Sequence, residues 1–326
     1  MPRGSVTFIT LPVLATPRNR RCGPVCRPLV LEQRSVSCEC YYSTSLGRSF
    51  PFNPHFEFLA EIPADLLENL VRRKAELNLT VGSSDLSFVW IALITVVILQ
   101  LSVLFTTVYL HRALTHRALN LHPLVVNIMH LHLTVFTGVI PREWAAVHRK
   151  HHHFSDREGD PHSPKVFGMW KVLFGNYFYY RRECDNRTTI NKYTPDYKPD
   201  VIDRIIPFPG FGAYIGLVVF ILMFGWTWGI GAWVFHIIGY LMLNSMINSL
   251  CHVIGYKNYD NGATNLQWVA LMTGGEGLHN NHHEFPTSAR FATKLGEIDP
   301  AWPFIKLLEI MRLADVNVVS LAKKAA

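Results

Sequence analysis

Charged residues are scarce in this chain, and the shortage is local. Asp, Glu, Lys and Arg make up 17% of its 326 residues, whereas soluble domains carry about 25%. None of the four occurs between Leu86 and Leu110. Because one crossing of a bilayer takes about 20 apolar residues, this stretch predicts a membrane span over about 88–110. A buried helix of a soluble domain rarely runs so long without a cap.

A second uncharged stretch runs from Ile205 to Tyr256 and is long enough for two spans. We expect these spans over about 211–228 and 233–249. Three glycines at positions 225, 229 and 231 mark the turn between them. Such a hairpin returns the chain to the side of the membrane from which it came.

Cysteine is scarce as well, and no disulfide framework is indicated. Four of the six cysteines lie in the first 40 residues, while Cys184 and Cys251 stand alone.

The net charge is +7, but the basic residues gather on no single stripe and form no binding motif, which argues against nucleic acid as a partner.

Basic residues instead flank the apolar segments. Arg112, Arg149 and Lys150 follow the first span on the side of the histidine clusters described below. The positive-inside rule makes that side cytoplasmic, or its stromal or matrix equivalent. A basic run at 72–74 flanks the other end of the first span and opposes this assignment, so the side of the N-terminus stays open.

Residues 1–55 differ in composition from the rest. The first 50 contain seven Arg and six Ser, no Lys, and only Glu32 and Glu39 as acids. This composition is typical of an organelle transit peptide; a disordered extension or a misassigned start is the alternative. Either way we expect the folded domain to occupy 56–326. Within it, the periodicity of 60–80 predicts a helix, either on the membrane surface or packed on the core.

Histidines are plentiful and unevenly placed. Eight of the 16 form three clusters: HRALTH at 111–116, and two copies of the pattern HxxHH beginning at His148 and His279. His252, at the end of the last expected span, is a further candidate. The nine candidate metal-binding histidines are His111, His116, His148, His151, His152, His252, His279, His282 and His283.

The clusters constrain the topology. The apolar segment 121–140 could cross a membrane by length, but crossing would put the first two clusters on opposite faces. Ligands of one metal centre must meet within a few ångströms. We therefore expect 121–140 to be interfacial, re-entrant or packed beneath the metal domain. The hairpin that follows places the third cluster on the same side as the second.

The spacing within the clusters suits metal binding. Residues three and four apart share a helix face, so each HxxHH can gather its histidines. His151 and His152 point about 100° apart on a helix and can serve two different metals, as can His282 and His283. His111 and His116 are five apart, which suits a helix end that unwinds slightly.

This ligand set predicts two metal ions. Nine nitrogens are too many for one tetrahedral zinc, and imidazole binds iron, zinc, copper or nickel alike. A site at a lipid boundary with open positions favours iron and dioxygen chemistry. Carboxylates near the clusters would hold the imidazole N–H groups and supply negative charge; an ordinary solvated acid is the alternative for each. The candidates are Asp156, Glu158, Asp160, Glu276 and Glu284.

Other polar residues near the clusters are less strongly indicated as metal ligands. Asn248, one helical turn before His252, either binds a metal through a water or ties helices together. His153 is expected to be a neighbour of the site or a support for a ligand, and His236 lies too far along its helix to join. We expect no metal role for His55, His122, His130, His132 or His162.

The three clusters, the motif NSLCH at 248–252, and the surrounding segments HRKHHHFSDREGDPHSP and GGEGLHNNHHEFPTSAR resemble those of membrane-bound fatty acyl desaturases. The resemblance covers about 85–315 and is greatest to the stearoyl-CoA desaturase-like group, especially its bacterial branch. It implies an all-α integral membrane protein with three to four membrane helices. It also implies a helical metal domain on the cytoplasmic or stromal side.

The resemblance further implies a chemistry. Two ferrous ions and dioxygen would insert a cis double bond, in the delta-9 position, into the saturated chain of an acyl-CoA or acyl-lipid. Two electrons would come from a separate ferredoxin, flavodoxin or b-type cytochrome with its reductase. The nine histidines match the family's ligands, and Asn248 matches its water-mediated position.

The chain departs from the family pattern in one respect, and two other functions are alternatives to desaturation. The family usually shows two spans before the first cluster, and only one is evident here. A hydroxylase acting on a lipid, an alkane or a carotenoid would use a similar centre. A histidine-rich metal transporter is a more distant alternative, because it needs ligands along a path inside its spans.

Overall fold

The computed structural model describes residues 25–26, 40–43, 49–51, 88–206 and 211–319. Contacts divide the chain into two units, Met1–Glu76 and Leu77–Ala326. In the first unit, three short antiparallel strands form a sheet in the order β1 (Val25–Cys26), β2 (Cys40–Ser43) and β3 (Ser49–Pro51). The expected helix over 60–80 and most of the expected extension over 1–55 lie outside the described residues, so both stay predictions.

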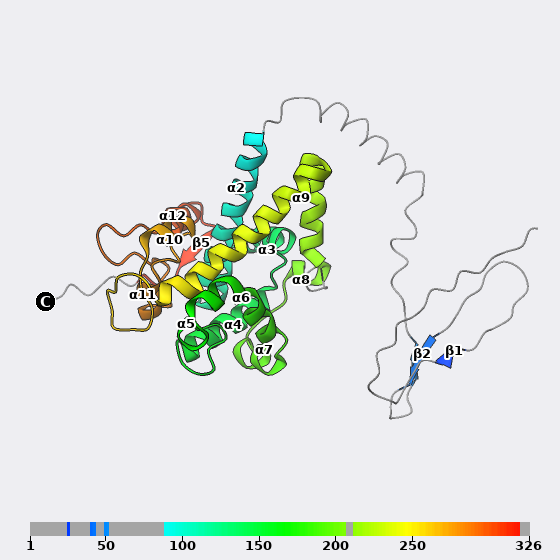
Figure 1. Ribbon diagram of the computed structural model, residues 1–326, viewed down its shortest axis with the longest axis horizontal. Coiled ribbons are helices and arrows are strands. Elements are labelled where there is room, and N and C mark those ends of the chain that lie inside the picture. The colour runs from blue at the N-terminus through cyan, green and yellow to red at the C-terminus, as the bar shows by residue number, and fades with distance from the viewer. Residues whose placement is uncertain (1–24, 27–39, 44–48, 52–87, 207–210, 320–326) are drawn as a thin grey trace, which may run out of the picture. The chain divides into compact units, whose positions relative to one another are not determined.

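The second unit is predominantly helical (Figure 1), as expected for an all-α membrane protein. A two-stranded sheet pairs β4 with β5. The elements are α2 (Phe88–Phe105), η2 (Thr106–Thr115), β4 (Leu119–Leu121), α3 (Pro123–Thr137), α4 (Pro141–Phe154), α5 (Pro164–Phe167), α6 (Met169–Cys184), α7 (Arg187–Tyr193), α8 (Val201–Ile205), α9 (Phe211–Ser249), η3 (Leu250–His252), α10 (Gln267–Met272), α11 (His279–Glu284), α12 (Ala301–Ile310) and β5 (Ala314–Val316).

Helix α2 carries no charge and leads directly into the first histidine cluster. Its two hydroxyl side chains are bonded within the helix: those of Thr95 and Ser102 donate to carbonyls one turn earlier, those of Ile91 and Ile98. This local bonding is what an apolar environment requires of a hydroxyl. By length and hydropathy, Phe88–Thr115 is a candidate membrane span.

Helix α9 folds back on itself and forms the expected hairpin. The break is at Gly225, whose backbone (φ 79°, ψ 176°) is one that only glycine adopts easily. After the break, Gly229 packs directly against the backbone of Phe220 and Ile221. In Figure 1 the chain rises to this turn in light green and descends in yellow. The tip of the hairpin meets the start of α2, since the rings of Phe88 and Trp228 lie 5.7 Å apart.

The hairpin corrects the expected boundaries of its two spans. The turn is made by Gly225 alone, so the first arm is shorter than 211–228 and the second begins before 233. Gly229 is not part of the turn but lets the two arms approach closely, and Gly231 is an ordinary helical residue with open space beside it. By length and the hydropathy of its most apolar part, Phe211–His252 is the second candidate membrane span.

Segment 121–140 becomes α3, which ends in a sharp bend. Gly138 takes a left-handed conformation (φ 67°), and α4 then leaves at 88° to α3. The carbonyl of Phe136, near the end of α3, accepts a hydrogen bond from His236 Nε2 of α9 (3.0 Å). The outward face of α3 is apolar, with Leu124, Ile128 and Leu131 exposed. Its interfacial position in a membrane stays a prediction.

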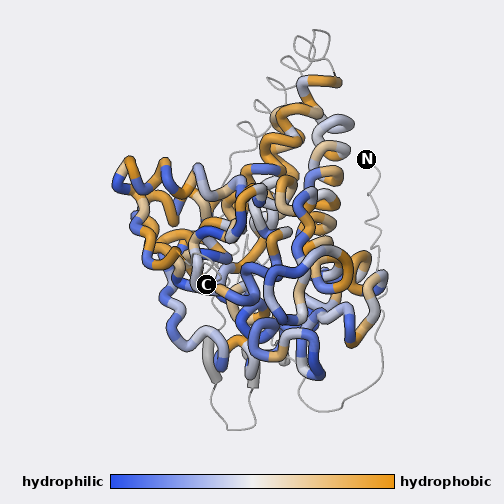
Figure 2. The backbone as a smooth tube through the Cα atoms, turned by 90° about the vertical axis from the view of Figure 1, so that its left-hand side faces the viewer, coloured by the Kyte–Doolittle hydropathy of each residue, from blue (hydrophilic) through white to orange (hydrophobic). Residues whose placement is uncertain are grey.

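Polar and apolar segments separate along the second unit. Figure 2 shows apolar backbone along the long helices at the top of the view and hydrophilic backbone concentrated at the bottom. Tyr109 and Leu110, at the end of the first candidate span, join one buried cluster with Met129 and Leu133 of α3 and Ile305 of α12. The end of the span is therefore fixed against the helices that surround the histidine clusters.

Candidate metal centre

The first histidine cluster lies on a widened helical turn. Helix η2 is a π-helix, in which residues five apart are bonded, and the amide of His116 donates to the carbonyl of His111 (3.1 Å). Residues five apart therefore face the same way, which explains the HxxxxH spacing. Single π-turns are frequent at functional sites, and the expectation of a locally unwound helix end is confirmed.

The second and third clusters lie on α4 and α11 and approach the first from the other sides. Helix α4 starts at Pro141, where the fixed φ of proline suits a first helical position, and carries His148, His151 and His152 in its last turns. The short helix α11 consists almost entirely of the third cluster. His252 arrives from the end of the hairpin, in η3.

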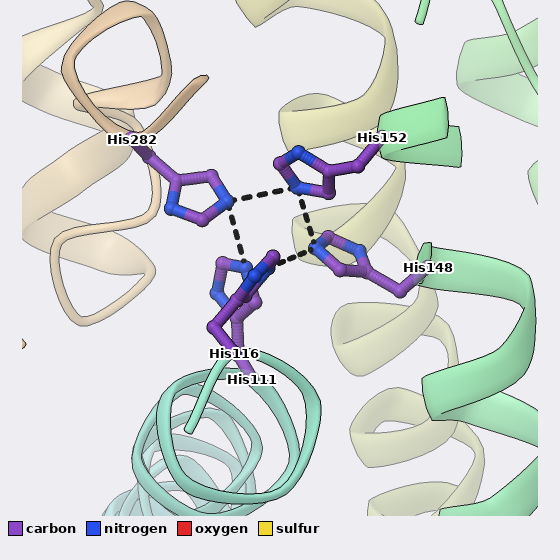
Figure 3. Close-up of side chains that lie close together, drawn as sticks. All are labelled: His111, His116, His148, His152 and His282. Carbon is purple, nitrogen blue, oxygen red and sulfur yellow. Dashed lines mark hydrogen bonds between the residues drawn. The ribbon is translucent and has the colours of Figure 1, made fainter. Parts of the chain in front are cut away.

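Five of these histidines form the first candidate metal-binding group (Figure 3). The Nε2 atoms of His111 and His282 lie 3.0 Å apart, and those of His116 and His148 lie 3.1 Å apart. His152 Nε2 links these two pairs, at 3.0 Å from both His148 Nε2 and His282 Nε2. All five imidazoles thus direct the same nitrogen toward one point.

The remaining four histidines form the second group. His283 Nε2 lies 3.1 Å from His279 Nε2 and 3.4 Å from His151 Nε2. The ring of His252 is 4.8 Å from that of His279 and 5.1 Å from that of His151. The structure therefore brings all nine candidate histidines into two adjacent groups. It separates His151 from His152, and His282 from His283, as the helical spacing predicts.

Carboxylates orient three of the imidazoles from behind. Glu276 Oε1 lies 2.6 Å from His111 Nδ1, and both oxygens of Asp160 lie 3.0 Å from His151 Nδ1. Asp156 Oδ2 is 3.0 Å from His252 Nδ1. An Nδ1–H donated to a carboxylate leaves the Nε2 lone pair free to face a metal. Three of the five expected acids thus have the expected contact.

The other two expected acids do not support the site. Glu158 and Glu284 are exposed, and the nearest recorded partner of Glu284 is the amide of Asn261, at 3.5 Å. Both follow a histidine cluster in the sequence, but their helices have ended or turned by then. Their side chains therefore point to solvent rather than to the imidazoles.

Burial and mutual repulsion keep five of the grouped histidines neutral. Burial first, and neighbouring imidazoles second, lower the pKa of His148, His152, His279, His282 and His283 well below the ordinary 6.5. Only the neutral imidazole has a lone pair for a metal. The fold therefore holds these side chains in the state that binds a cation.

The acid behind His252 stays ionised. Burial alone would raise the pKa of Asp156, but hydrogen bonds from His252 and from Lys165 Nζ (2.8 Å) outweigh it and lower this pKa to about 2. A permanent negative charge at this position compensates part of the charge that two cations would bring. The donor set of neutral imidazoles backed by carboxylates therefore fits a pair of transition-metal ions.

Unpaired nitrogens give an independent test of this fit. His252 Nε2 is buried and has no hydrogen-bond partner in the described part of the chain. In the first group, five Nε2 atoms face one another, and neutral imidazoles whose N–H bonds point outward cannot satisfy such a ring of lone pairs. A buried polar atom without a partner costs about 1–3 kcal/mol. A cation in each group removes this cost.

A cavity of about 540 Å³ opens beside the first group. His111, His148 and Glu276 form part of its wall, and Asn248 lies on the same wall. Trp144, which also lines the cavity, stacks on His148 with ring centroids 4.8 Å apart and planes 11° apart. The rest of the lining is largely apolar and includes Val103, Val139, Ile140, Leu241, Leu243 and Ile247.

The histidines without an expected metal role are placed elsewhere, with one exception. His153 is exposed, His122 accepts from the amide of Leu124, and His130 and His132 contact Asp200 and Ser102. The exception is His162, which is buried and stacks on His151 with centroids 4.9 Å apart. Burial lowers its pKa to about 3. The sequence feature that points to this placement is its position two residues after Asp160, an expected support for the metal-binding histidines. His55 lies outside the described residues.

The two asparagines inside the third cluster hold the surrounding loops. The Asn280 amide donates to the carbonyls of Tyr259 (2.9 Å) and Ala263 (3.0 Å). The Asn281 amide donates to Glu297 Oε2 (2.9 Å). The variable positions of HxxHH therefore fix α11 against its neighbours, while its histidines face the two histidine groups.

Comparison with known proteins agrees with this geometry. Residues 88–298 match the family model of the fatty acid desaturases. The sn-1 stearoyl-lipid 9-desaturase of Anabaena variabilis is 32% identical over 221 residues, which is 67% of this chain and 79% of the relative. Delta-9 acyl-lipid desaturase 1 of Arabidopsis thaliana is 32% identical over 250 residues, 72% of this chain and 78% of the relative.

A third relative carries a different acyl carrier in its name. The acyl-CoA 5-desaturase of Anemone leveillei is 34% identical over 231 residues, 66% of this chain and 68% of the relative. The matched segment contains all three histidine clusters and His252. The chain belongs to the fatty acid desaturase family.

Proposed function

We propose that this membrane oxidoreductase introduces a cis double bond, in the delta-9 position, into the saturated acyl chain of a membrane lipid. The observation that carries the proposal is the pair of histidine groups beside an apolar cavity. The delta-9 position and the lipid carrier are supported by the names of relatives from Anabaena variabilis and Arabidopsis thaliana. Acyl-CoA is the competing carrier, because the Anemone leveillei relative is named for it.

We further propose that the two groups hold iron. His111, His116, His148, His152 and His282 would bind one ion, and His151, His252, His279 and His283 the other. When bound, the two ions supply dioxygen activation and the removal of hydrogen from carbon. Asn248, on the cavity wall, would hold a water at the open side. The reaction balances as –CH2–CH2– + O2 + 2 e⁻ + 2 H⁺ → –CH=CH– + 2 H2O.

The residues of the chain select and protect the reacting carbons. The cavity wall that contains His111 and His148 would place one pair of neighbouring methylenes beside the centre, a positioning effect. Apolar neighbours such as Val103 and Leu243 exclude water from that place. Glu276 and Asp160 keep the imidazoles behind them in one orientation. The two electrons would come from a separate ferredoxin, flavodoxin or b-type cytochrome.

Expression of the full chain in a host that lacks the activity tests this function. We expect new monounsaturated chains, two hydrogens lighter than their precursors, with the double bond mapped to the ninth carbon by fragmentation. Gain of one oxygen without loss of two hydrogens would instead indicate a hydroxylase. Separate measurement of the lipid and acyl-CoA fractions at early times identifies the carrier that is first desaturated.

Metal content tests the centre independently of the product. We expect about two iron atoms per chain in protein purified from iron-replete cells. Stoichiometric zinc without iron, in a protein that still produces monounsaturated lipid, would contradict the diiron proposal.

A further inference from the structure

Helix α6 presents a row of large aromatic side chains to its surroundings. Trp170, Phe174 and Phe178 recur every four residues and are 64%, 69% and 71% exposed. The rings of Trp170 and Phe174 are stacked, with centroids 6.1 Å and planes 11° apart. Residues four apart share one face of a helix, so these three form a continuous aromatic ridge. A ridge of this kind marks an interaction surface.

The buried face of α6 and one edge of its exposed face lie on the cavity. Asn176 and Tyr180 line it, together with Ala213 of the first arm of α9 and Asn244 of the second. Both arms are near their metal-side ends at these residues. Helix α6 therefore lies across the base of the hairpin, where the apolar helices meet the metal domain.

The exposed face of α6 is continuous with that of the hairpin. Tyr177 of α6 and Tyr214 of α9 both line the cavity and are 48% and 68% exposed. Further along the same arm of α9, Val218 and Leu222 are exposed at 53% and 60%. The exposed apolar surface of the candidate span thus continues, past the cavity residues Tyr177 and Tyr214, onto α6.

Basic residues border the aromatic ridge. Lys171 and Arg182 are exposed, and the 3.6-residue repeat puts both at the same edge of the ridge. The Arg182 guanidinium lies 5.8 Å from the ring centre of Phe167 and 5.7 Å from that of Tyr179. Aromatic side chains and flanking Lys or Arg are the usual composition of helices that lie in a membrane surface.

We propose that α6 lies in the membrane surface, with its aromatic ridge inserted at the boundary between headgroups and acyl chains. The exposed cavity residues Tyr177 and Tyr214 then face lipid. An acyl chain can enter the cavity without passing through water, a consequence that rests on the proposed function. The position of α6 itself does not depend on that function.

Photo-crosslinking of the full chain in membranes tests the position of α6. The variants Phe174→p-benzoylphenylalanine and Phe178→p-benzoylphenylalanine each place a photoreactive ring on the ridge. Leu222→p-benzoylphenylalanine, on the exposed face of α9, is the positive control. Thr188→p-benzoylphenylalanine, on the exposed helix α7, is the negative control. After irradiation, mass spectrometry of the purified protein identifies what is attached.

We expect phospholipid adducts at positions 174, 178 and 222 and none at 188. Adducts at 222 with none at 174 and 178 would overturn the proposal. Attachment of another protein at 174 and 178 in place of lipid would overturn it as well, because the ridge would then be a protein interface. The readout needs no catalytic turnover, so it stays informative if the chain proves to have another activity.

Discussion

The ring of His152 lies on the ring of His283, with centroids 4.5 Å apart and planes inclined by 21°. His152 belongs to the first candidate metal-binding group and His283 to the second. The two groups therefore share a wall formed by one side chain from each HxxHH cluster. A change at His152 affects both the nitrogen ring of the first group and the packing of the second.

Replacement of His152 should abolish desaturation. The variant His152→Ala removes the nitrogen that lies 3.0 Å from both His148 Nε2 and His282 Nε2, so we expect loss of iron and no monounsaturated product. Iron analysis and lipid profiling of cells that express the variant measure this. The control is His153→Ala, which changes the exposed neighbour and should keep both iron and product. Equal activity of the two variants would contradict the ligand assignment.

Glu276 should control how tightly the first group holds its metal. Glu276→Gln keeps the size of the side chain but removes the charge beside His111 Nδ1. Loss of such a supporting group costs about 10- to 100-fold in metal affinity. Competition with a chelator, followed by iron analysis, measures the change. Glu284→Gln, at an exposed acid, is the matched control, and an equal loss in both variants would argue against a specific role for Glu276.

Val103 should limit the length of the acyl chain. Its side chain is buried, lines the cavity and packs with Leu99 and Tyr240. Val103→Phe fills part of this space, at an overpacking cost of about 1–3 kcal/mol, and we expect palmitoyl products to gain over stearoyl products. Val96→Phe, on the exposed face of the same helix, should leave the ratio unchanged. If neither variant changed the ratio of palmitoyl to stearoyl products, Val103 would not limit the length of the acyl chain.

Acid should destabilise the metal-free protein. The pKa values of His148, His279 and His282 are lowered in the fold, so below about pH 6.5 the unfolded chain takes up protons that the folded chain excludes. The contribution of these histidines to the free energy of unfolding is therefore complete above about pH 6.5. It is lost as the pH drops toward their lowered pKa values. Thermal unfolding in detergent between about pH 7.5 and 5 measures this. A midpoint that rises on acidification would contradict it.

The turn of α9 should depend on the backbone of Gly225 alone. A Cβ at Gly225 or at Gly231 would meet no atom within 4 Å, but only Gly225 has a positive φ. Gly225→Ala should therefore cost about 1–3 kcal/mol through strain, whereas Gly231→Ala should be neutral or stabilising, by up to about 1 kcal/mol. Thermal unfolding midpoints of both variants in detergent give the comparison. Similar midpoints would show that the turn adapts to a side chain.

Local spacing determines much of the metal centre. The HxxHH pattern predicts that His151 and His152 separate into two groups, because a helix turns by about 100° per residue, and the structure confirms it. The five-residue spacing of His111 and His116 indicates a widened turn, which is present as a π-helix. In both cases the relevant geometry lies within one helix and follows from its pitch.

Contacts between distant segments do not follow from local spacing. Glu276 and His111 are 165 positions apart, and nothing local distinguishes Glu276 from Glu284, which is exposed. His162 belongs to none of the three clusters, so the sequence predicts no metal role for it, yet a loop brings it onto His151. The cavity likewise depends on the packing of α6 across both arms of α9, which hydropathy does not encode.

The position of the hairpin turn is a further feature that the sequence does not determine. Hydropathy is nearly uniform through this stretch, so three glycines were equal candidates for the turn. Gly225 makes the turn, Gly229 allows close packing and Gly231 does neither. The distinction depends on backbone angles and interhelical distance, which a single sequence does not reveal.

The pairing of β4 with β5 has a consequence for the order of assembly. Leu119 pairs with Val316, so the segment just after the first histidine cluster is closed by residues near the C-terminus. Contacts between such distant segments form late, because the loop between them must first be ordered. During synthesis, the first cluster leaves the ribosome long before the third. All nine candidate histidines are therefore present only after the α9 hairpin has been synthesised, and a chain truncated before α11 lacks the whole third cluster.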